Sequence, residues 1–127
     1  MINFKVVPKG NPSNEEAPQR YYANVLSNGV SDMRAIAEKI SDRCTLTTVD
    51  TIAVLEALVS LIPQELADGK IVKLGDFGTF KISLRSEGAT SAELFSKQSI
   101  KEAKVHFRQG LEFRKKFQNL NYAKLVG

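Results

Sequence analysis

Hydrophobic and polar residues alternate at the start of the chain, where Ile2, Phe4 and Val6 are separated by polar residues. A period of two is typical of a half-buried strand. Residues 8–18 are rich in Pro, Gly, Asn, Ser and Glu, which predicts a linker, and residues 20–26 suggest a second strand. We expect the first strand to add to a sheet edge, with contact to a partner chain as the alternative.

The spacing then changes to that of a helix. Ser31 is placed to cap free backbone N–H groups, and Ile36, Ala37 and Ile40 recur at helical intervals. The sequence therefore predicts a helix of about ten residues beginning near Ser31.

A second helix is predicted after Thr47, whose hydroxyl and the carboxylate of Asp50 form a variant of the capping box. Residues 52–62 contain two polar residues only, so this helix is apolar almost all the way round. In a small protein such a helix indicates that a second subunit covers its far side, although a central helix wrapped by its own chain remains the alternative. Pro63 predicts a kink or a restart, and Asp68-Gly69 predicts the end.

The period returns to two in the second half of the chain. Residues 71–74 and 79–85 read as strands joined by a glycine-bracketed turn at residues 75–78. In the later strand the apolar residues alternate with polar ones, which are Thr79, Lys81, Ser83 and Arg85.

A third strand over residues 103–108 repeats this alternation. Ala103, Val105 and Phe107 point one way, while the polar residues Lys104, His106 and Arg108 point the other. After Gly110, apolar residues recur at helical spacing, which predicts a short amphipathic helix containing Phe113, Phe117 and Leu120.

Composition favours one folded domain with an extension. The chain has 127 residues, of which 43% are hydrophobic and 25% charged, as in ordinary globular proteins. No apolar run approaches the roughly 18 residues of a membrane span, and the first residues lack the pattern of a signal peptide. We therefore expect a cytoplasmic protein that does not interact with membranes.

Charge is uneven along the chain, although the net value is only +4. Residues 1–96 carry ten Lys and Arg against twelve Asp and Glu, whereas residues 97–127 carry eight against two. A local positive field of this kind favours a polyanionic partner, nucleic acid before membrane, with a solvated basic helix as the alternative.

Little in the chain indicates catalysis. It has one cysteine, Cys44, and one histidine, His106, and neither has an obvious catalytic partner. The glycines at residues 75–78 bracket a hairpin turn and do not form a phosphate-binding loop before a helix. We predict no enzyme activity, no catalytic residues, no metal, no cofactor and no small-molecule substrate.

Three short motifs, in this order, resemble the HU family of bacterial histone-like DNA-binding proteins. They are Ile36-Ala37-Glu38-Lys39 in the first helix, Leu74-Gly75-Asp76-Phe77-Gly78-Thr79-Phe80 at the hairpin, and Phe107-Arg108-Gln109-Gly110, which is similar to the family's Phe-Lys-Pro-Gly. The order of elements over residues 31–120 agrees. Residues 1–30 resemble the extension of a longer HU-related subgroup, and residues 121–127 read as a C-terminal tail.

The resemblance implies an α+β fold in which two chains form an intertwined dimer. Its helices would form the base and its sheets a saddle with protruding β-arms. Double-stranded DNA would lie in the saddle, so we expect a nucleoid-associated homodimer that binds the DNA backbone without sequence preference. The candidate DNA-contacting residues are Lys81, Ser83, Arg85, Lys97, Lys101, Lys104, His106, Arg108, Arg114 and Lys115.

The chain departs from the family in the arm. HU arms carry a tip proline that wedges between base steps, but no proline follows Pro63 here, and residues 86–99 contain two glutamates and one lysine. Leu94 and Phe95 are an alternative wedge. Asp76 stands where the family usually has a glycine, so the turn geometry is expected to shift. The sequence thus predicts a protein that holds the DNA backbone more than it kinks the duplex.

Two other functions remain open. The first is an HU-fold protein-interaction module that has lost DNA binding, and the second is RNA binding. DNA binding predicts that the cations of the two strands share one surface, whereas an interaction module predicts an apolar or acid-neutralised one.

Overall fold

The computed structural model of the chain describes residues 1–10, 13 and 16–125. The chain divides into two compact units, the extension unit (residues 1–32 and 116–127) and the core unit (residues 33–115). The predicted domain boundaries at residues 31 and 120 stay a prediction, and the middle of the predicted linker, residues 11–12 and 14–15, lies outside the described residues.

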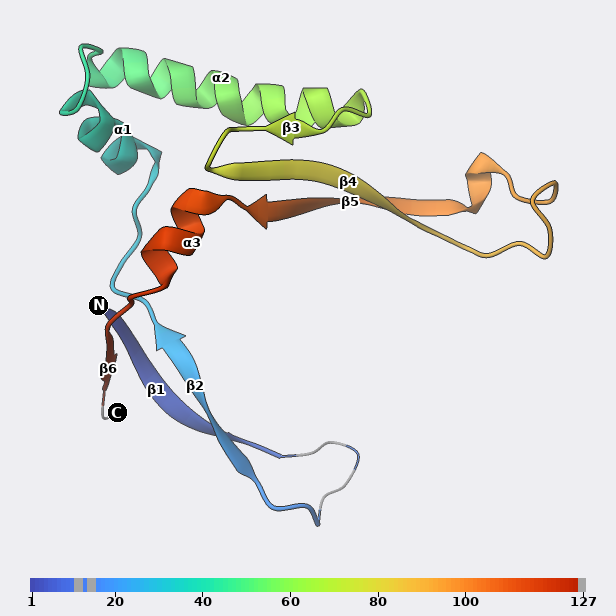
Figure 1. Ribbon diagram of the computed structural model, residues 1–127, viewed down its shortest axis with the longest axis horizontal. Helices are drawn as coiled ribbons and strands as arrows, with labels where there is room; N and C mark the ends of the chain where they lie inside the picture. The colour runs from blue at the N-terminus through green and yellow to red at the C-terminus, as the bar shows by residue number, and fades with distance from the viewer. Residues whose placement is uncertain (11–12, 14–15, 126–127) are drawn as a thin grey trace. The chain divides into compact units, whose positions relative to one another are not determined.

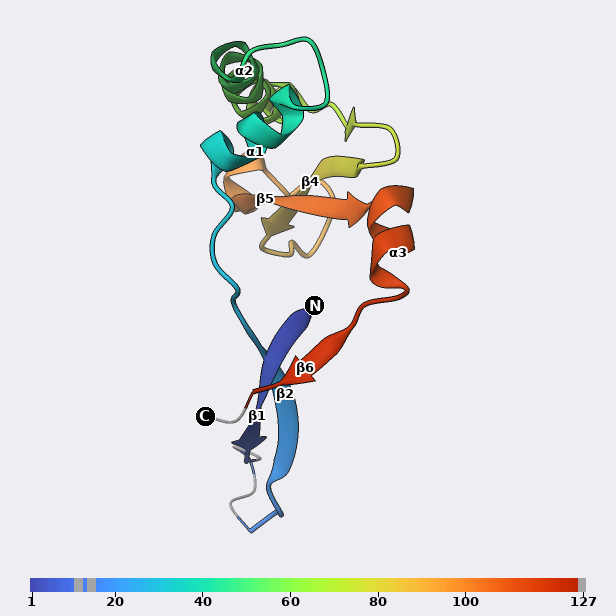
Figure 2. The ribbon, with the colours of Figure 1, turned by 90° about the vertical axis from the view of Figure 1, so that its left-hand side faces the viewer.

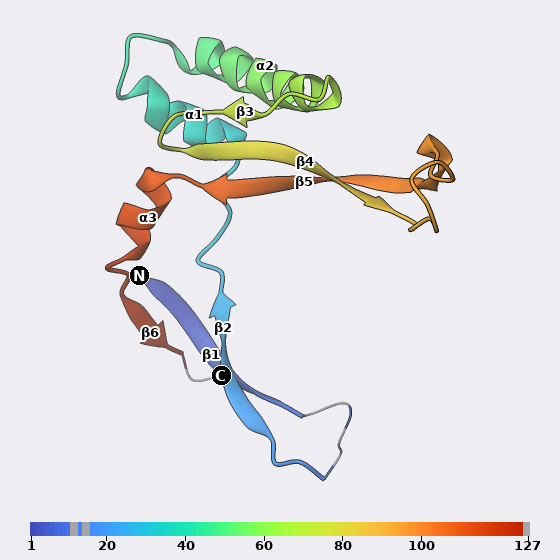
Figure 3. The ribbon, with the colours of Figure 1, turned by 45° about the vertical axis from the view of Figure 1, so that its right-hand side comes forward.

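The extension unit is a three-stranded sheet with the order β2-β1-β6, formed by β1 (Ile2–Lys9), β2 (Arg20–Leu26) and β6 (Tyr122–Lys124). The two predicted strands are confirmed and pair antiparallel, while β6 pairs parallel to β1 (Figure 3). Strand β1 is the central strand of this sheet. The expectation that it adds to a sheet edge is therefore wrong, because β2 and β6 occupy both of its sides.

The core unit begins with two helices, α1 (Met33–Ser41) and α2 (Thr48–Ala67), which lie against each other (Figure 2). The Thr47 hydroxyl accepts a hydrogen bond from the Asp50 N–H at 3.1 Å, as the capping pattern predicts. The helix ends at Ala67, and Gly69 follows with φ of +81°, the left-handed conformation that the predicted helix end requires.

Helix α2 runs without a break through Pro63, so the predicted restart does not occur. Proline removes one N–H donor from the helix and crowds the carbonyl one turn earlier, that of Val59. Val59 is 61% exposed in the single chain, and the helix extends one turn beyond Pro63 to Ala67.

The sheet of the core unit has the order β3-β4-β5. It is formed by β3 (Val72–Lys73), β4 (Gly78–Ser86) and β5 (Ile100–Gln109), and its neighbouring strands pair antiparallel. The predicted hairpin is confirmed between β3 and β4. Strands β4 and β5 form a long two-stranded arm that ends in the loop of residues 87–99 (Figure 1). A register shift between Arg85 and Ser86 marks an irregularity, and the short 3-10 helix η1 (Lys97–Ser99) precedes β5.

The base of the arm is held by aromatic rings. The ring of Phe80 lies 4.7 Å from that of Phe107, and Phe77 lies 5.1 Å from Phe113, measured between centroids. Phe113 comes from helix α3 (Leu111–Phe117), the predicted C-terminal helix. Pairs at these distances each contribute about 0.5–1.5 kcal/mol beyond the burial of their surface.

Large apolar side chains of α2 remain exposed in the single chain. Among the described residues, Ala37 and Leu66 are the buried hydrophobic ones. Along α2, by contrast, Val54 is 56% exposed and Leu61 is 51% exposed, with Leu58 between them at 38%. The three residues are four and three positions apart, so they lie on the same face of the helix. The single chain therefore leaves an apolar stripe of α2 uncovered.

Replacement of Gly78 by alanine is expected to destabilise the fold. Gly78 is buried with φ of +153°, and a Cβ there would lie 2.5 Å from the backbone oxygen of Arg108. Gly78→Ala should lower the free energy of unfolding by about 2–3 kcal/mol, measured by urea denaturation. Gly88→Ala is the control, because among the described residues no heavy atom lies within 4 Å of its Cβ. Equal losses in the two variants would contradict this assignment.

Candidate nucleic-acid interface

The register of the arm brings the two predicted polar rows onto one face. Lys81 lies opposite His106, Ser83 opposite Lys104, and Thr79 opposite Arg108. Directly opposed residues of an antiparallel pair project from the same face of the sheet. Phe80 and Phe107 are likewise opposed, so the aromatic and apolar residues gather on the other face. We call the first the polar arm face.

Lys73 extends the polar arm face onto a third strand. It lies opposite Thr79 in the β3–β4 pair, and Thr79 in turn lies opposite Arg108. Sequence reasoning placed Lys73 in a strand over residues 71–74 but missed its place on this face, because the face depends on which residue of β4 lies opposite it. A shallow depression of about 290 Å³ lies here. Its lining residues are Ile71, Lys73, Thr79, Lys81, His106, Phe107 and Arg108.

One side-chain hydrogen bond crosses the polar arm face. The Ser83 hydroxyl and His106 Nε2 are 2.6 Å apart, which links the two strands across a diagonal of the sheet. Ser83 lies opposite Lys104, next to His106 along β5. This contact fixes the imidazole near the middle of the face, between Lys104 and Arg108 in sequence.

Glu102 places a negative charge on the same face, which the sequence analysis overlooked. Its carboxylate Oε1 lies 3.4 Å from Arg85 Nε and 3.4 Å from Lys104 Nζ. The carboxylate is 43% exposed, and surface ion pairs of this kind are worth at most about 1 kcal/mol. Two of the predicted DNA-contacting cations are therefore weakly paired with a carboxylate, so the cations nearer the base of the arm carry more of the uncompensated positive charge.

Four predicted residues lie away from the polar arm face. Lys101 follows the opposite alternation from Glu102 and pairs with Glu87 at 3.3 Å. Lys97 belongs to η1 within the arm loop, and the remaining two, Arg114 and Lys115, are on α3. Arg114 borders a second open hollow, of about 420 Å³, which Arg108 also lines.

The arm loop carries apolar side chains at its surface. Leu94 is 68% exposed and Phe95 is 41% exposed, and the loop backbone is held by the Glu87 N–H donating to the Ser99 carbonyl at 2.8 Å. These two residues are the ones that the sequence analysis considered as a wedge. Their exposure leaves them accessible to a partner molecule.

Within residues 1–10, 13 and 16–125, no group of three or more His, Cys, Asp or Glu side chains is placed to hold a metal ion. No helix in the same part of the chain is long and apolar enough to cross a membrane. Cys44 is an exposed free thiol. The polar arm face is composed of cations and hydrogen-bonding groups, an arrangement suited to binding an anionic polymer.

A family described as an HU domain fused to a winged helix-turn-helix, Ig or glycine-rich motif, HU-HIG, matches residues 1–124. The chain belongs to the HU-HIG family. The match covers the extension unit as well as the core unit, so the extension is part of the HU-HIG pattern and not an unrelated addition. The predicted relationship to HU is confirmed at the level of the family.

A solved structure shares the fold. It is a protein from Bacteroides vulgatus, provisionally described as a bacterial DNA-binding protein, with a TM-score of 0.66 and 11% sequence identity. The similarity covers 98% of this HU-HIG chain and 48% of the other, so this chain spans about half the length of that protein. A comparison with curated proteins finds no match. The α+β fold class and the likeness to HU are confirmed.

Proposed function

We propose that this HU-HIG protein binds double-stranded DNA through the polar arm face, as a homodimer and without sequence preference. The observation that carries the proposal is the β4–β5 register, which gathers Lys81, Arg108 and the polar residues between them on one face. The family match to HU supports it independently. Each cation that neutralises a phosphate releases condensed counterions, and this release drives binding whatever the base sequence.

The dimer part of the proposal rests on the uncovered stripe of α2. Val54, Leu58 and Leu61 expose apolar surface that the chain's own elements leave open. A second copy covering this stripe removes that surface from water, at about 25 cal/mol for each Å². Two chains joined in this way would form the intertwined helical base, and their arms would form the saddle.

The proposed mechanism is to hold the backbone more than to kink the duplex. Lys73, Lys81 and Arg108 are exposed or line the shallow depression, and Ser83 and His106 add hydrogen-bonding groups between them. Such groups contact phosphates and fix the register of a duplex without reading bases. Related arms bend DNA with a proline wedge at the tip, and this sequence has no proline after Pro63 to form such a wedge.

Glu102 favours one alternative, an HU-fold module that binds a protein. Its carboxylate is shared by Arg85 and Lys104, as expected for a partly acid-neutralised face. Binding to RNA duplexes is a further alternative. The proposal includes no catalytic activity and no cofactor, and it places the protein with the nucleoid in the cytoplasm.

Charge reversal on the polar arm face tests the proposal. Lys81→Glu/Arg108→Glu should weaken binding to unrelated duplexes by at least tenfold, measured by gel shift at low salt. The slope of log K against log salt should become shallower by about 2–4, since a dimer loses up to four phosphate contacts. Lys39→Glu/Arg43→Glu, on α1 and the turn after it, is the control of equal charge.

Undetectable binding by the unchanged chain at low salt, or equal behaviour of these two variants, would contradict DNA binding through this face. Tighter binding to RNA duplexes than to DNA duplexes would favour the RNA alternative.

Removal of the Glu102 carboxylate should strengthen binding. Glu102→Gln frees Arg85 and Lys104 for phosphates, and we expect duplex affinity to rise about fivefold, in keeping with surface pairs worth up to about 1 kcal/mol. Glu65→Gln is the matched control, because Glu65 also pairs with a lysine, at 3.2 Å, but lies on α2. An unchanged or weakened affinity in Glu102→Gln, measured by fluorescence anisotropy, would favour the protein-interaction alternative.

A charged residue on the α2 stripe should separate the chains. Leu58→Glu introduces a carboxylate on the proposed dimer face, and desolvating an unpaired charge there costs several kcal/mol. We expect the species in sedimentation analysis to shift from dimer towards monomer. Val30→Glu is the control, since Val30 is 92% exposed and outside the helices. A monomeric unchanged chain, or an unchanged dimer in Leu58→Glu, would contradict the proposed base.

A further inference from the structure

The extension sheet has a basic face of its own. In the β1–β2 register, Lys5 lies opposite Asn24 and Lys9 lies opposite Arg20, with Tyr22 between them on the same face. The opposite face carries apolar residues and Lys124, which β6 aligns with Phe4. We call the first the extension basic face.

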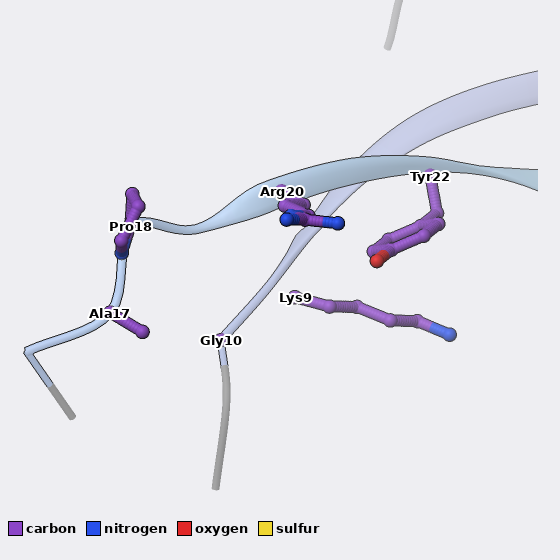
Figure 4. Close-up of a pocket in the computed structure, with 6 residues that line it drawn as sticks. All are labelled: Lys9, Gly10, Ala17, Pro18, Arg20 and Tyr22. Atoms are coloured by element: carbon purple, nitrogen blue, oxygen red, sulfur yellow. The ribbon is translucent and has the colours of Figure 1, made fainter. Parts of the chain in front are cut away.

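The end of this face near the hairpin tip is hollowed. An open hollow of about 490 Å³ is lined by Lys9, Gly10, Ala17, Pro18, Arg20 and Tyr22. In the close-up, the side chains of Lys9, Arg20 and Tyr22 lie together on one side of it (Figure 4). Lys9 Nζ lies 5.6 Å from the centre of the Tyr22 ring, within the range of a cation–π contact.

The pairing of Lys9 with Arg20 is unfavourable for the sheet itself. Like charges directly opposite each other destabilise an antiparallel pair. Within the described part of the chain, no ion pair involves Lys5, Lys9 or Arg20, whereas Arg85, Lys101 and Lys104 of the arm all have glutamate partners. An anion bound between Lys9 and Arg20 would relieve this repulsion.

Phosphate is the anion that this chemistry fits best. A lysine gives a point charge, and an arginine gives a planar fork that matches phosphate oxygens. The Tyr22 hydroxyl and the Asn24 amide add neutral donors of the kind that position nucleic-acid backbones. The hollow is open and its polar groups are exposed, as a site for a polymer backbone requires.

We propose that the extension basic face is a second phosphate-binding surface for nucleic acid, used together with the polar arm face. This inference rests on the proposed function. The chain passes between the extension unit and the core unit twice, at residues 32–33 and 115–116, so the two surfaces are covalently linked. Binding at one surface raises the effective concentration of nucleic acid at the other, which increases the overall affinity.

The experiment compares Lys9→Glu with Lys124→Glu in the full chain. Both change the charge equally and lie on opposite faces of one sheet. Lys9→Glu also places a carboxylate opposite Arg20, which favours the hairpin, so weaker binding cannot be ascribed to its unfolding. Lys9→Glu should weaken binding to a 40-base-pair duplex at least fivefold and make the salt slope shallower by about 1–2, while Lys124→Glu stays within twofold.

Equal effects of Lys9→Glu and Lys124→Glu would overturn the inference. A second result would also overturn it: Lys9→Glu binds the duplex as well as the unchanged chain does, but no longer sediments with phosphatidylserine vesicles. That result would assign this face to lipid. The variant Lys81→Glu/Arg108→Glu is titrated in parallel. If it weakens binding and Lys9→Glu does not, the inference fails while the proposed function stands; if the unchanged chain binds no duplex, both fail.

Discussion

The antiparallel register of β4 and β5 is the constraint on which the rest of the structure depends. It sets Phe80 against Phe107 on one side of the arm and Lys81 against His106 on the other. A slip of one residue would move every side chain of a strand to the opposite face. The aromatic pair at 4.7 Å, joined by Phe77 and Phe113, holds the register at the base of the arm, so the packing that stabilises the hairpin also collects the cations.

A second constraint is the small core of a single chain. In the described part of the chain, burial of hydrophobic side chains is complete or nearly so at Ala37 and Leu66 only, while α2 presents an apolar stripe. The net free energy of folding of a protein is small, so apolar surface left in water on α2 is a substantial loss of stabilisation. The proposed dimer accounts for both the small core and the exposed stripe, since a second chain would cover the stripe. It would also place two arms around one duplex. The extension basic face would add phosphate contacts of its own, on a unit that the chain links covalently to the core unit.

Much of the core unit could be predicted because its signals are local. The capping residues Thr47 and Asp50 mark the start of α2, and alternation marks β4 and β5. Alternation alone does not show that the polar residues of β4 and β5 share one face. That depends on how the two strands pair, and residues far apart in the sequence form this pairing. Glu102 was missed because it lies just before the predicted third strand, whose pattern was read from residue 103 onwards.

Other features lacked a local signal altogether. Strand β6 has three residues, too few for a period, and exists because β1 offers a free edge. Lys73 joins the polar arm face only through the β3–β4 register. At Pro63 the sequence allows either a break or a continuous helix, because proline costs free energy inside a helix without forbidding it, and the structure has the continuous helix.

The single histidine of the chain provides the most direct test of the central claim. His106 lies on the polar arm face, 2.6 Å from the Ser83 hydroxyl, so its imidazole signals in an NMR spectrum report on that face alone. If the face binds the DNA backbone, adding duplexes of unrelated sequence should shift these signals with one saturation curve, and added salt should reverse the shift. Signals that stay unmoved while the duplex is bound would contradict the account.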